Sequence, residues 1–383
     1  MKKLLRALAN TFIFLFILAA CLEVGSCLYI RFFNNSIPLP TYSMVNAESS
    51  FWVDINPYFG VWHDANSSYM HNKQCATVYY TANSHGMRDP ERSLHSDQPR
   101  IAVLGDSFVE GYIVEDGHRL TDLAEKHYGL EFLNYGTSGG HGTLNEWLQY
   151  KHMVKNFDHD AIIIGVLPSN DMSDSLKKEV YMTNDRYRRP YLEGTYPNYK
   201  VLYSQKEMPI RHRRDLMKSF DHTLREWSYT YRILRYLDSF DIKNFDFRAR
   251  WQSKQDRAKA YISKYNSFTE EEWNAMRYCF EQLVKEAGDK PILMFVIPRY
   301  SDIMVYDGTQ PPLSANLEKL AKENGIDYVD LLPEMAKKTQ TPEEYFLICD
   351  AHWNNYGNEV AFEILQPHIE KLIATMKTAN QTN

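Results

Sequence analysis

Two short segments, far apart in the chain, carry the residues with the clearest chemical meaning. Residues 105–108 (Gly-Asp-Ser-Phe) follow the apolar run 101–104, so a serine is predicted on the sharp turn after a buried strand. Residues 350–354 (Asp-Ala-His-Trp-Asn) place a carboxylate and an imidazole two positions apart. Together these segments supply a candidate nucleophile (Ser107), a base (His352) and an acid that orients the base (Asp350). Such a system is defined by its geometry and not by the order of its residues in the chain.

Each segment also has a purely structural interpretation. Asp-Ser is common at the start of a helix, where it caps free N–H groups, and a single histidine before tryptophan is often a structural residue. The chemical interpretation adds three features. Gly105 permits a sharp turn. A helix that begins at Ser107 would point its free N–H groups at a developing oxyanion. In an extended segment, residues two apart point the same way, so Asp350 can reach the Nδ1–H group of His352.

These segments and two between them resemble, in order, the four sequence blocks of the GDSL/SGNH hydrolase family. Residues 134–139 (Asn-Tyr-Gly-Thr-Ser-Gly) resemble the second block, whose glycine supplies an oxyanion N–H group, and Gly139 is the matching position. Residues 168–171 (Pro-Ser-Asn-Asp) are similar to the third block, whose asparagine donates to the oxyanion, and Asn170 matches. The resemblance implies a nucleophile, a base and an orienting carboxylate at Ser107, His352 and Asp350. It also implies an oxyanion hole built from Ser107, Gly139 and Asn170.

The chain departs from the usual family pattern at three places. Phe108 stands where leucine is usual, and Pro168 stands where glycine is usual, which changes the expected loop shape but not the Asn170 amide. One residue, not two, separates Asp350 from His352. This shorter spacing occurs in membrane-anchored and polysaccharide-modifying relatives, which also have tryptophan after the histidine. The resemblance covers most of residues 100–372, apart from a long insertion.

Strands and helices alternate along the second part of the chain. Such alternation predicts a parallel sheet covered on both faces, with ligands at the carboxyl ends of the strands. The expected strands are 101–104, 131–134, 161–167, 292–297 and 326–330, and the expected helices are 121–127, 144–154, 313–323 and 356–376. The resemblance implies an α/β fold of the flavodoxin-like, three-layer SGNH type around a central parallel sheet.

Three segments are predicted outside that core. Residues 1–32 form a cytoplasmic tip and anchor, and residues 33–99 are an irregular tether and lead-in to the hydrolase-like domain at 100–383. The insertion at 172–290 follows Asn170 directly, so we expect a lid or substrate platform. We expect irregular structure at 181–203, and helices at 216–237 and from a capping box at 269–272 to residue 287. The basic cluster at 211–214 is interpreted as a solvated helix start, with contact to an anionic glycan or to lipid headgroups as the alternative.

The stretch Asn83-x-x-Gly86-x-Arg88 resembles one that precedes the serine block in membrane-anchored relatives. A simple turn with Gly86 at positive φ is one interpretation. The alternative is that this stretch shapes the site.

The N-terminus predicts a membrane association. Residues 12–30 are apolar apart from Glu23, and their number is close to the roughly 20 that cross a bilayer as a helix. Positive residues before the run predict a cytoplasmic N-terminus and an exported domain, periplasmic or at the cell surface. A cleaved signal peptide is one alternative. A lipoprotein anchored through Cys21 is another, because residues 18–21 (Leu-Ala-Ala-Cys) resemble its cleavage box.

Composition excludes several other classes. The 383 residues are 44% hydrophobic and 24% charged, with a net charge of −6, so nothing indicates a nucleic-acid partner. We expect no cofactor, because no glycine-rich phosphate loop is present. We expect no metal, because none of the 13 histidines lies in a metal-binding pattern. His141, His152 and His159 are interpreted as packing or solvent residues.

Three cysteines would be exported, namely Cys75, Cys279 and Cys349. In an oxidising compartment they permit one disulfide and leave one unpaired thiol. Because Cys349 adjoins Asp350, a bond to either Cys75 or Cys279 would brace the segment that carries His352.

The leading functional hypothesis is an exported serine esterase or O-acyltransferase that acts on an ester, with O-acyl groups of cell-envelope carbohydrate as the expected substrate. A lipase or thioesterase at the membrane surface is a second hypothesis, and a non-catalytic envelope assembly protein is a third. If the protein is a transferase, a single span predicts that a separate membrane protein supplies the acyl group.

Overall fold

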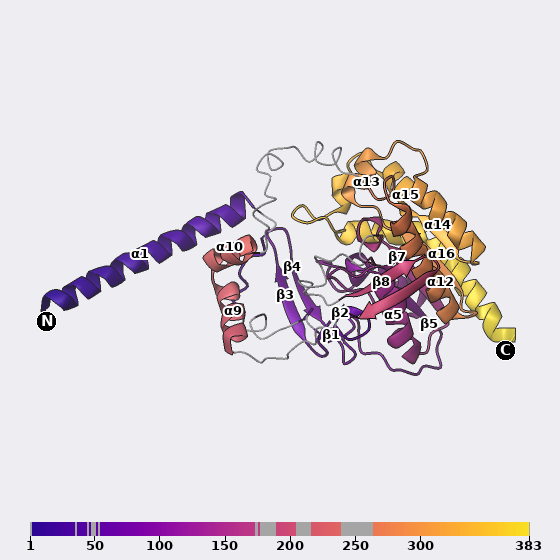
Figure 1. Cartoon of the computed structure of the whole chain (residues 1–383), viewed down its shortest axis with the longest axis horizontal. Helices are drawn as coiled ribbons and strands as arrows, with labels where there is room; N and C mark the ends of the chain where they lie inside the picture. Colours follow the sequence, from indigo (N-terminus) through magenta and orange to yellow (C-terminus); the bar gives the residue numbers. More distant parts are fainter. Residues whose placement is uncertain are drawn as a thin grey trace. The chain divides into compact units, whose positions relative to one another are not determined.

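The computed structural model describes residues 2–34, 37–43, 46, 51–52, 54–172, 175–176, 189–203, 216–238 and 263–382 (Figure 1). The chain forms two compact units. The first comprises Met1–Ser49, Ser68–Tyr79 and Arg213–Arg250, and the second comprises Ser50–Ser67, Tyr80–His212 and Trp251–Asn383. The second unit thus begins ahead of the predicted domain start at residue 100. The reason is that Phe59, Trp62 and Met87 join its hydrophobic core.

A five-stranded parallel sheet forms the centre of the second unit. Its strands are β5 (Arg100–Leu104), β6 (Glu131–Asn134), β7 (Ala161–Val166), β10 (Ile292–Val296) and β11 (Asp327–Asp330). The spatial order is β11-β10-β7-β5-β6, and every pairing is parallel. Numbered along the chain, this is the flavodoxin-like order 2-1-3-4-5. The predicted fold class is therefore confirmed.

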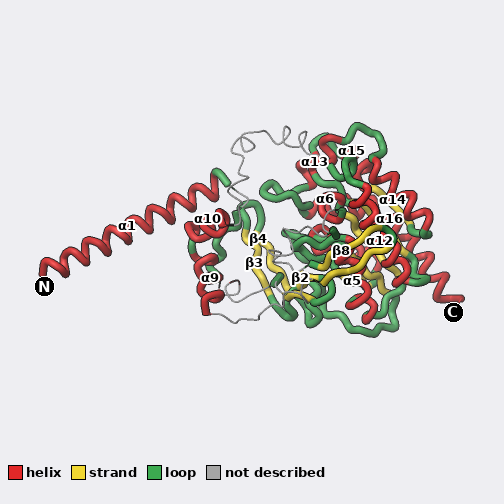
Figure 2. Tube along the Cα trace, viewed as in Figure 1, coloured by secondary structure: helices red, strands yellow, loops and turns green. Residues whose placement is uncertain are grey.

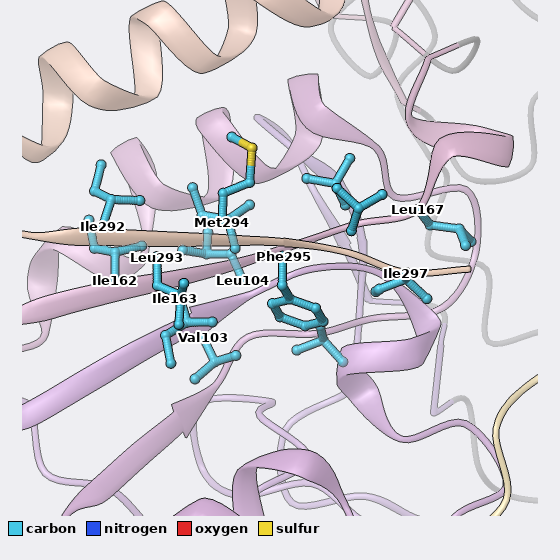
Figure 3. Close-up of a cluster of buried hydrophobic side chains, with 14 of the residues drawn as sticks. Val103, Leu104, Ile162, Ile163, Leu167, Ile292, Leu293, Met294, Phe295 and Ile297 are labelled. Carbon is cyan, nitrogen blue, oxygen red and sulfur yellow. The ribbon is translucent and has the colours of Figure 1, made fainter. Parts of the chain in front are cut away.

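The central strands are apolar because both faces of the sheet are covered. All residues of β5, β7 and β10 are buried, and Figure 3 shows side chains of these strands projecting to both sides of the sheet. On one face, α4 (Leu120–Tyr128) packs against α16 (Asn355–Thr382). Right-handed crossovers place α5 (Thr143–His152) and α12 (Glu270–Ala287), which pack together, on the other face.

Further helices complete this unit: α13 (Tyr300–Val305), α14 (Pro312–Glu323) and α15 (Leu331–Lys338). The predicted capping box at the start of α12 is present. The Thr269 hydroxyl accepts from the N–H group of Glu272 at 3.1 Å, and the Glu272 carboxylate accepts from the N–H group of Thr269 at 2.9 Å.

Two segments that we expected to be irregular contain strands (Figure 2). Within 33–99, β1 (Asp54–Asn56) pairs antiparallel with β2 (Gly60–Trp62), and β3 (Ser68–Asn72) pairs with β4 (Thr77–Thr81). Residues of β4 alternate between exposed and buried, the pattern of a half-buried strand, which the prolines and asparagines nearby concealed. Within 181–203, β8 (Pro190–Thr195) pairs with β9 (Asn198–Tyr203), while residues 181–188 lie outside the described part.

The first unit contains α1 (Lys2–Phe32), α9 (Leu216–Trp227) and α10 (Tyr229–Asp238). Among the described residues, α1 is the one helix long and apolar enough to cross a membrane. The expected single helix over 216–237 is two helices. Ser228 interrupts it because its hydroxyl accepts from the N–H group of Tyr231 at 3.1 Å and so begins a new helix. The basic cluster 211–214 lies outside the described residues.

The cysteines fall into two classes. Cys21, Cys27 and Cys279 are free thiols, whereas Cys75 and Cys349 are each disulfide-bonded. A Cys279–Cys349 bond is therefore wrong. Cys279 is completely buried, and burial raises the pKa of its thiol well above the ordinary value, which makes it unreactive in the folded protein.

We expect the denatured, unreduced chain to show three reactive thiols, and five after reduction, in a thiol titration. Cys279→Ser should lower the first count to two. Cys349→Ser should raise it to four, because it frees the sulfur to which Cys349 is bonded. Five reactive thiols before reduction would contradict the assignment.

Candidate active site

Three of the predicted site residues lie at the carboxyl ends of adjacent strands, and Asp350 and His352 lie in the loop before α16. Ser107 begins α3 (Ser107–Glu110) just after β5, and Asn170 lies in α6 (Pro168–Asp171) just after β7. Gly139 lies in the loop after β6. Chain order reverses between β5 and β7, and in open α/β sheets such a switch point is where ligands bind. The side chain of Asn170 is not among those that the structure describes.

The turn that presents Ser107 combines both interpretations of its sequence. The Asp106 carboxylate accepts from the N–H group of Phe108 at 2.9 Å and caps α3, as in the structural interpretation. Ser107 is then the first helical residue, with its hydroxyl free to project from the turn. A glycine is required at position 105 because the Val109 side chain lies so close to its backbone that a Cβ atom there would collide with it.

A chain of hydrogen bonds joins Ser107, His352 and Asp350. The Ser107 Oγ atom lies 2.7 Å from Nε2 of His352, and Nδ1 of His352 lies 2.5 Å from Oδ1 of Asp350. Because the carboxylate accepts a hydrogen bond from the Nδ1–H group, the unprotonated Nε2 atom is left to accept a hydrogen bond from the serine hydroxyl. Asp350 Oδ1 also accepts from the N–H groups of Ala351 at 2.8 Å and His352 at 3.2 Å, so the loop backbone fixes the carboxylate.

The loop that carries His352 is held from several sides. The His352 carbonyl accepts from the N–H group of Leu347 at 2.9 Å, and Phe346 and Trp353 form a β-bridge. The rings of Phe108 and Tyr112 lie 4.8 and 4.6 Å from the His352 ring. The His352 side chain remains 22% exposed, so a substrate can reach the imidazole from solvent.

The stretch from Asn83 to Arg88 supports the turn from behind. Gly86 has φ +77°, as the turn interpretation predicts, and a Cβ atom there would lie 2.5 Å from the His63 carbonyl oxygen. The buried Arg88 guanidinium donates to the carbonyls of Gly111 and Val114, just after α3, and lies 3.8 Å from the Tyr80 ring centroid. These contacts favour the alternative in which the stretch shapes the site.

Glu110, a residue that the sequence did not lead us to expect in the site, connects the Gly139 loop to α3, the helix that begins with Ser107. The Glu110 carboxylate is completely buried and accepts from Nε1 of Trp52 at 2.9 Å and from the Ser138 hydroxyl, next to Gly139. His63 Nε2 lies 3.2 Å from the same carboxylate, and its Nδ1 lies 2.8 Å from the Gly86 carbonyl oxygen. An acidic residue one turn after the serine, in an apolar stretch, was the available clue.

Burial alone would raise the pKa of Glu110. The hydrogen bond and charge of His63, followed by the charge of Arg88 and the hydrogen bond from Ser138, outweigh it, so the pKa lies below the ordinary value of 4.5. Glu110 is therefore an ionised, buried group at neutral pH.

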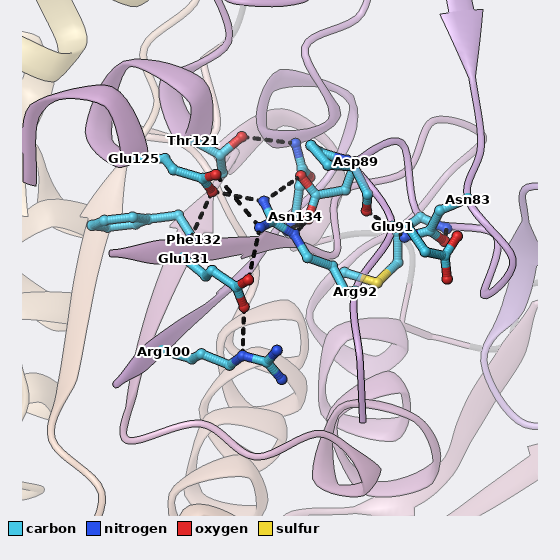
Figure 4. Close-up of polar contacts among 12 residues, drawn as sticks. Asn83, Asp89, Glu91, Arg92, Arg100, Thr121, Glu125, Glu131, Phe132 and Asn134 are labelled. Carbon is cyan, nitrogen blue, oxygen red and sulfur yellow. Dashed lines mark hydrogen bonds and ion pairs between the residues drawn. The ribbon is translucent and has the colours of Figure 1, made fainter. Parts of the chain in front are cut away.

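Asn134, at the end of β6, makes a second link between the loop and α3. Its amide donates to the Val109 carbonyl at 3.0 Å and to the Thr121 hydroxyl at 3.1 Å, and its side-chain oxygen accepts from the N–H group of Gly136 at 2.9 Å. Figure 4 shows Asn134 beside a chain of ion pairs, in which Arg92 pairs with Asp89 at 2.8 Å and with Glu125 at 2.6 Å.

Histidines outside the site have packing partners. His141 Nε2 lies 3.1 Å from Gln149 Oε1, and burial lowers the pKa of His141 to about 4. His159 lies 3.0 Å from the Tyr150 hydroxyl, and His152 stacks on Tyr58. Among the described residues, no group of three or more His, Cys, Asp or Glu side chains is arranged to hold a metal.

Comparison with known proteins gives one family match. Residues 304–383, which include Asp350 and His352, match the model of the family described as "SGNH hydrolase-like domain, acetyltransferase AlgX". No curated protein matches the chain.

Solved structures that are similar to the chain include three lipolytic proteins or acylhydrolases. The lipase/acylhydrolase from Enterococcus faecalis is 11% identical, with a TM-score of 0.37 over 71% of this chain and 96% of that one. A lipolytic protein of the G-D-S-L family from Veillonella parvula is 12% identical, with a TM-score of 0.36 over 70% and 96%. A putative acylhydrolase from Bacteroides fragilis is 12% identical, with a TM-score of 0.35 over 74% and 91%.

We predict that Glu110→Gln lowers the free energy of unfolding at pH 7 by about 1.5–3 kcal/mol, the worth of hydrogen bonds to a charged group. Because the pKa of Glu110 is lowered in the folded protein, its ionised form stabilises the fold above pH 4.5. This contribution is lost as the pH falls through the folded-state pKa. Urea unfolding should therefore show that the difference in stability between wild type and variant narrows as the pH falls from 4.5 through the folded-state pKa of Glu110.

Glu323→Gln is the matched control, because Glu323 is exposed and its ion pair with Lys319, at 3.9 Å, lies at the surface. It should change stability by less than about 0.5 kcal/mol at pH 7. An equal loss in both variants, or a gap at Glu110 that is constant with pH, would count against the buried carboxylate.

Proposed function

Because the chain belongs to the GDSL/SGNH hydrolase family, we propose that it is a serine-dependent esterase or O-acyltransferase that works through an acyl-enzyme. The observation that carries the proposal is the hydrogen-bonded series Ser107–His352–Asp350 at the switch point of the sheet. The three residues come from two distant segments, and the order of their contacts is the one that a nucleophile, a base and an orienting acid require.

In the proposed mechanism, Ser107 Oγ attacks the acyl carbon while His352 Nε2 takes the hydroxyl proton. Asp350 holds the imidazole in the required tautomer and stabilises the imidazolium that forms. The N–H groups of Ser107 and Gly139 and the side chain of Asn170 stabilise the oxyanion. His352 then returns the proton to the leaving alcohol, and the acyl group stays on Ser107. Water or a second hydroxyl, deprotonated by His352, releases it.

We propose O-acyl groups of cell-envelope carbohydrate as the substrate, with acetyl as the acyl group. The support is the match of residues 304–383 to a family described by an acetyltransferase, AlgX. The one-residue spacing between Asp350 and His352, followed by Trp353, agrees with it. In a transferase reaction, a sugar hydroxyl takes the place of water, and a separate membrane protein supplies the acyl group.

We propose that α1 anchors the protein in a membrane, with the hydrolase-like unit on the extracytoplasmic side. Lys2, Lys3 and Arg6 precede the apolar run, which favours a cytoplasmic N-terminus. An uncleaved helix is favoured because Glu23 of α1 binds the first turn of α10, a contact that removal of the helix would abolish.

We expect the full-length protein in detergent to hydrolyse p-nitrophenyl acetate, and Ser107→Ala to reduce the rate to background. His352→Ala should lower kcat by about 10²–10⁴-fold, the usual contribution of a general base. Ser93→Ala is the matched control, because Ser93 is exposed, and it should retain full activity. A series from acetyl to long acyl esters, with and without sugar acceptors, would separate esterase, transferase and lipase activities.

Activity that persists in Ser107→Ala would contradict the proposed nucleophile. If the wild type is also inactive toward the model ester, labelling with a fluorophosphonate probe, which reacts with activated serines, tests whether Ser107 is a nucleophile. The probe should label wild type and Ser93→Ala but not Ser107→Ala, and absence of labelling in all three would favour the non-catalytic alternative.

The oxyanion role of Asn170 makes a separate prediction. Asn170→Ala should lower kcat by about 10²–10³-fold with a small change in KM, because the amide acts on the transition state and not on the bound ester. Asn266→Ala, at an exposed position, is the control and should leave both constants unchanged. A loss in KM alone would show that Asn170 binds substrate without stabilising the oxyanion.

A further inference from the structure

An acidic residue in the apolar helix α1 has found partners in the first unit. The Glu23 carboxylate accepts from the Ser228 hydroxyl at 2.9 Å and from the N–H groups of Tyr229 and Thr230 at 2.5 and 3.1 Å. These are the free N–H groups at the start of α10. A carboxylate inside a membrane span is costly unless it is paired, so the first turn of α10 removes a penalty that α1 would otherwise carry.

These hydrogen bonds fix the depth of α10 in a membrane. Glu23 lies seven residues before Ile30, the end of the apolar run, which corresponds to about 10 Å along the helix. The hydrocarbon layer is about 30 Å thick, so Glu23 lies inside its outer part when residues 12–30 cross it. Atoms within hydrogen-bonding distance of Glu23 must lie at the same depth. The first turn of α10 is therefore below the outer boundary of the hydrocarbon.

Two further contacts align α10 with the last turns of α1. The Ser26 hydroxyl donates to the Thr230 hydroxyl at 3.2 Å, and the Arg31 guanidinium donates to the Tyr229 hydroxyl at 3.1 Å. Ile233 and Tyr236 of α10 pack with Ile30 in a small apolar cluster. The contact between the helices thus extends from Glu23 to Arg31, the part of α1 that approaches the membrane surface.

Large apolar side chains of α9 and α10 are nevertheless exposed. Thr230, Leu234 and Leu237 share one face of α10, at the spacing i, i+4, i+7, and this stripe starts at the contact with Ser26. Leu234 and Leu237 are 56% and 48% exposed. On α9, Phe220 and Trp227 lie seven positions apart, and therefore on one face of the helix, and they are 62% and 49% exposed.

In contrast to these apolar side chains, two charged groups of α9 and α10 are buried and paired. Glu226 and Arg232 are buried and pair at 2.8 Å, and Glu226 also accepts from the Thr41 hydroxyl at 2.7 Å. Arg235 remains about half exposed. A helix with an exposed apolar face, a tryptophan and a peripheral arginine is typical of elements that lie in the membrane interface.

We propose that α9 and α10 form a second membrane contact in the outer leaflet of the bilayer crossed by α1, at the boundary between the interfacial layer and the hydrocarbon. Phe220, Trp227, Leu234 and Leu237 contact lipid acyl chains there. This inference rests on the membrane anchor proposed above and is independent of the catalytic proposal. Lipid is favoured over a protein partner because the Glu23 hydrogen bonds already hold α10 at the level of the hydrocarbon.

The test uses the full-length protein in liposomes made with lipids brominated on the acyl chains, which quench tryptophan on contact. The fluorescence difference between wild type and Trp227→Phe reports Trp227 alone. We expect this difference signal to be lost in brominated liposomes and to be insensitive to aqueous iodide. The same comparison with Trp147→Phe is the matched control, because Trp147 is buried in α5, and neither quencher should affect its signal.

Quenching of Trp227 by iodide and not by brominated lipid would overturn the proposal, because the helices would then face water. Resistance to both quenchers would also overturn it, since a protein surface would then cover them. Phe220→Trp in the Trp227→Phe background gives a second probe if the first variant folds poorly. Extraction of membranes with alkaline carbonate separates failure of the α1 anchor from failure of the α9–α10 contact. Release of the protein would contradict the anchor itself.

Discussion

The hydrogen bond between Ser107 and His352 joins residues 245 positions apart in the chain, and much of the second unit serves to make it. Ser107 is placed by the buried strand β5 and the cap at Asp106. His352 is placed by a loop that leads into α16, a helix on the sheet face that α4 also covers. Neither segment specifies the 2.7 Å contact by itself. It depends on the parallel sheet, which gathers the carboxyl ends of strands distant in sequence at one edge.

The four residues of α3 are too few to form a stable helix alone. Buried polar contacts supply the stability that its length does not. Arg88 donates to backbone carbonyls at its end, and Glu110 and Asn134 connect it to the loop that carries Gly139. A buried charge is costly unless its partners are in place, so this arrangement tolerates little displacement. Such rigidity suits the proposed oxyanion site, because its donors must be in position before charge develops.

In the first unit the same physical constraint applies to a carboxylate carried by an apolar helix. Glu23 in α1 and the free N–H groups at the start of α10 are each unfavourable in an apolar medium, and each satisfies the other. Ser228 separates α9 from α10 and creates that helix start. Placement of a polar interaction in an apolar segment thus fixes the geometry between two elements that lie about 200 residues apart in sequence.

The sequence alone was enough to predict the central strands, because a strand buried on both faces must be continuously apolar, as 101–104 and 292–296 are. It also indicated Ser107, Asp350 and His352, whose local spacing carries chemical meaning. It did not reveal the strands at 54–81 and 190–203, where half-buried patterns are short and interrupted. Nor did it reveal Glu110 or the division at Ser228. Those features depend on partners remote in the chain, and only the tertiary structure determines which polar groups meet when water is excluded.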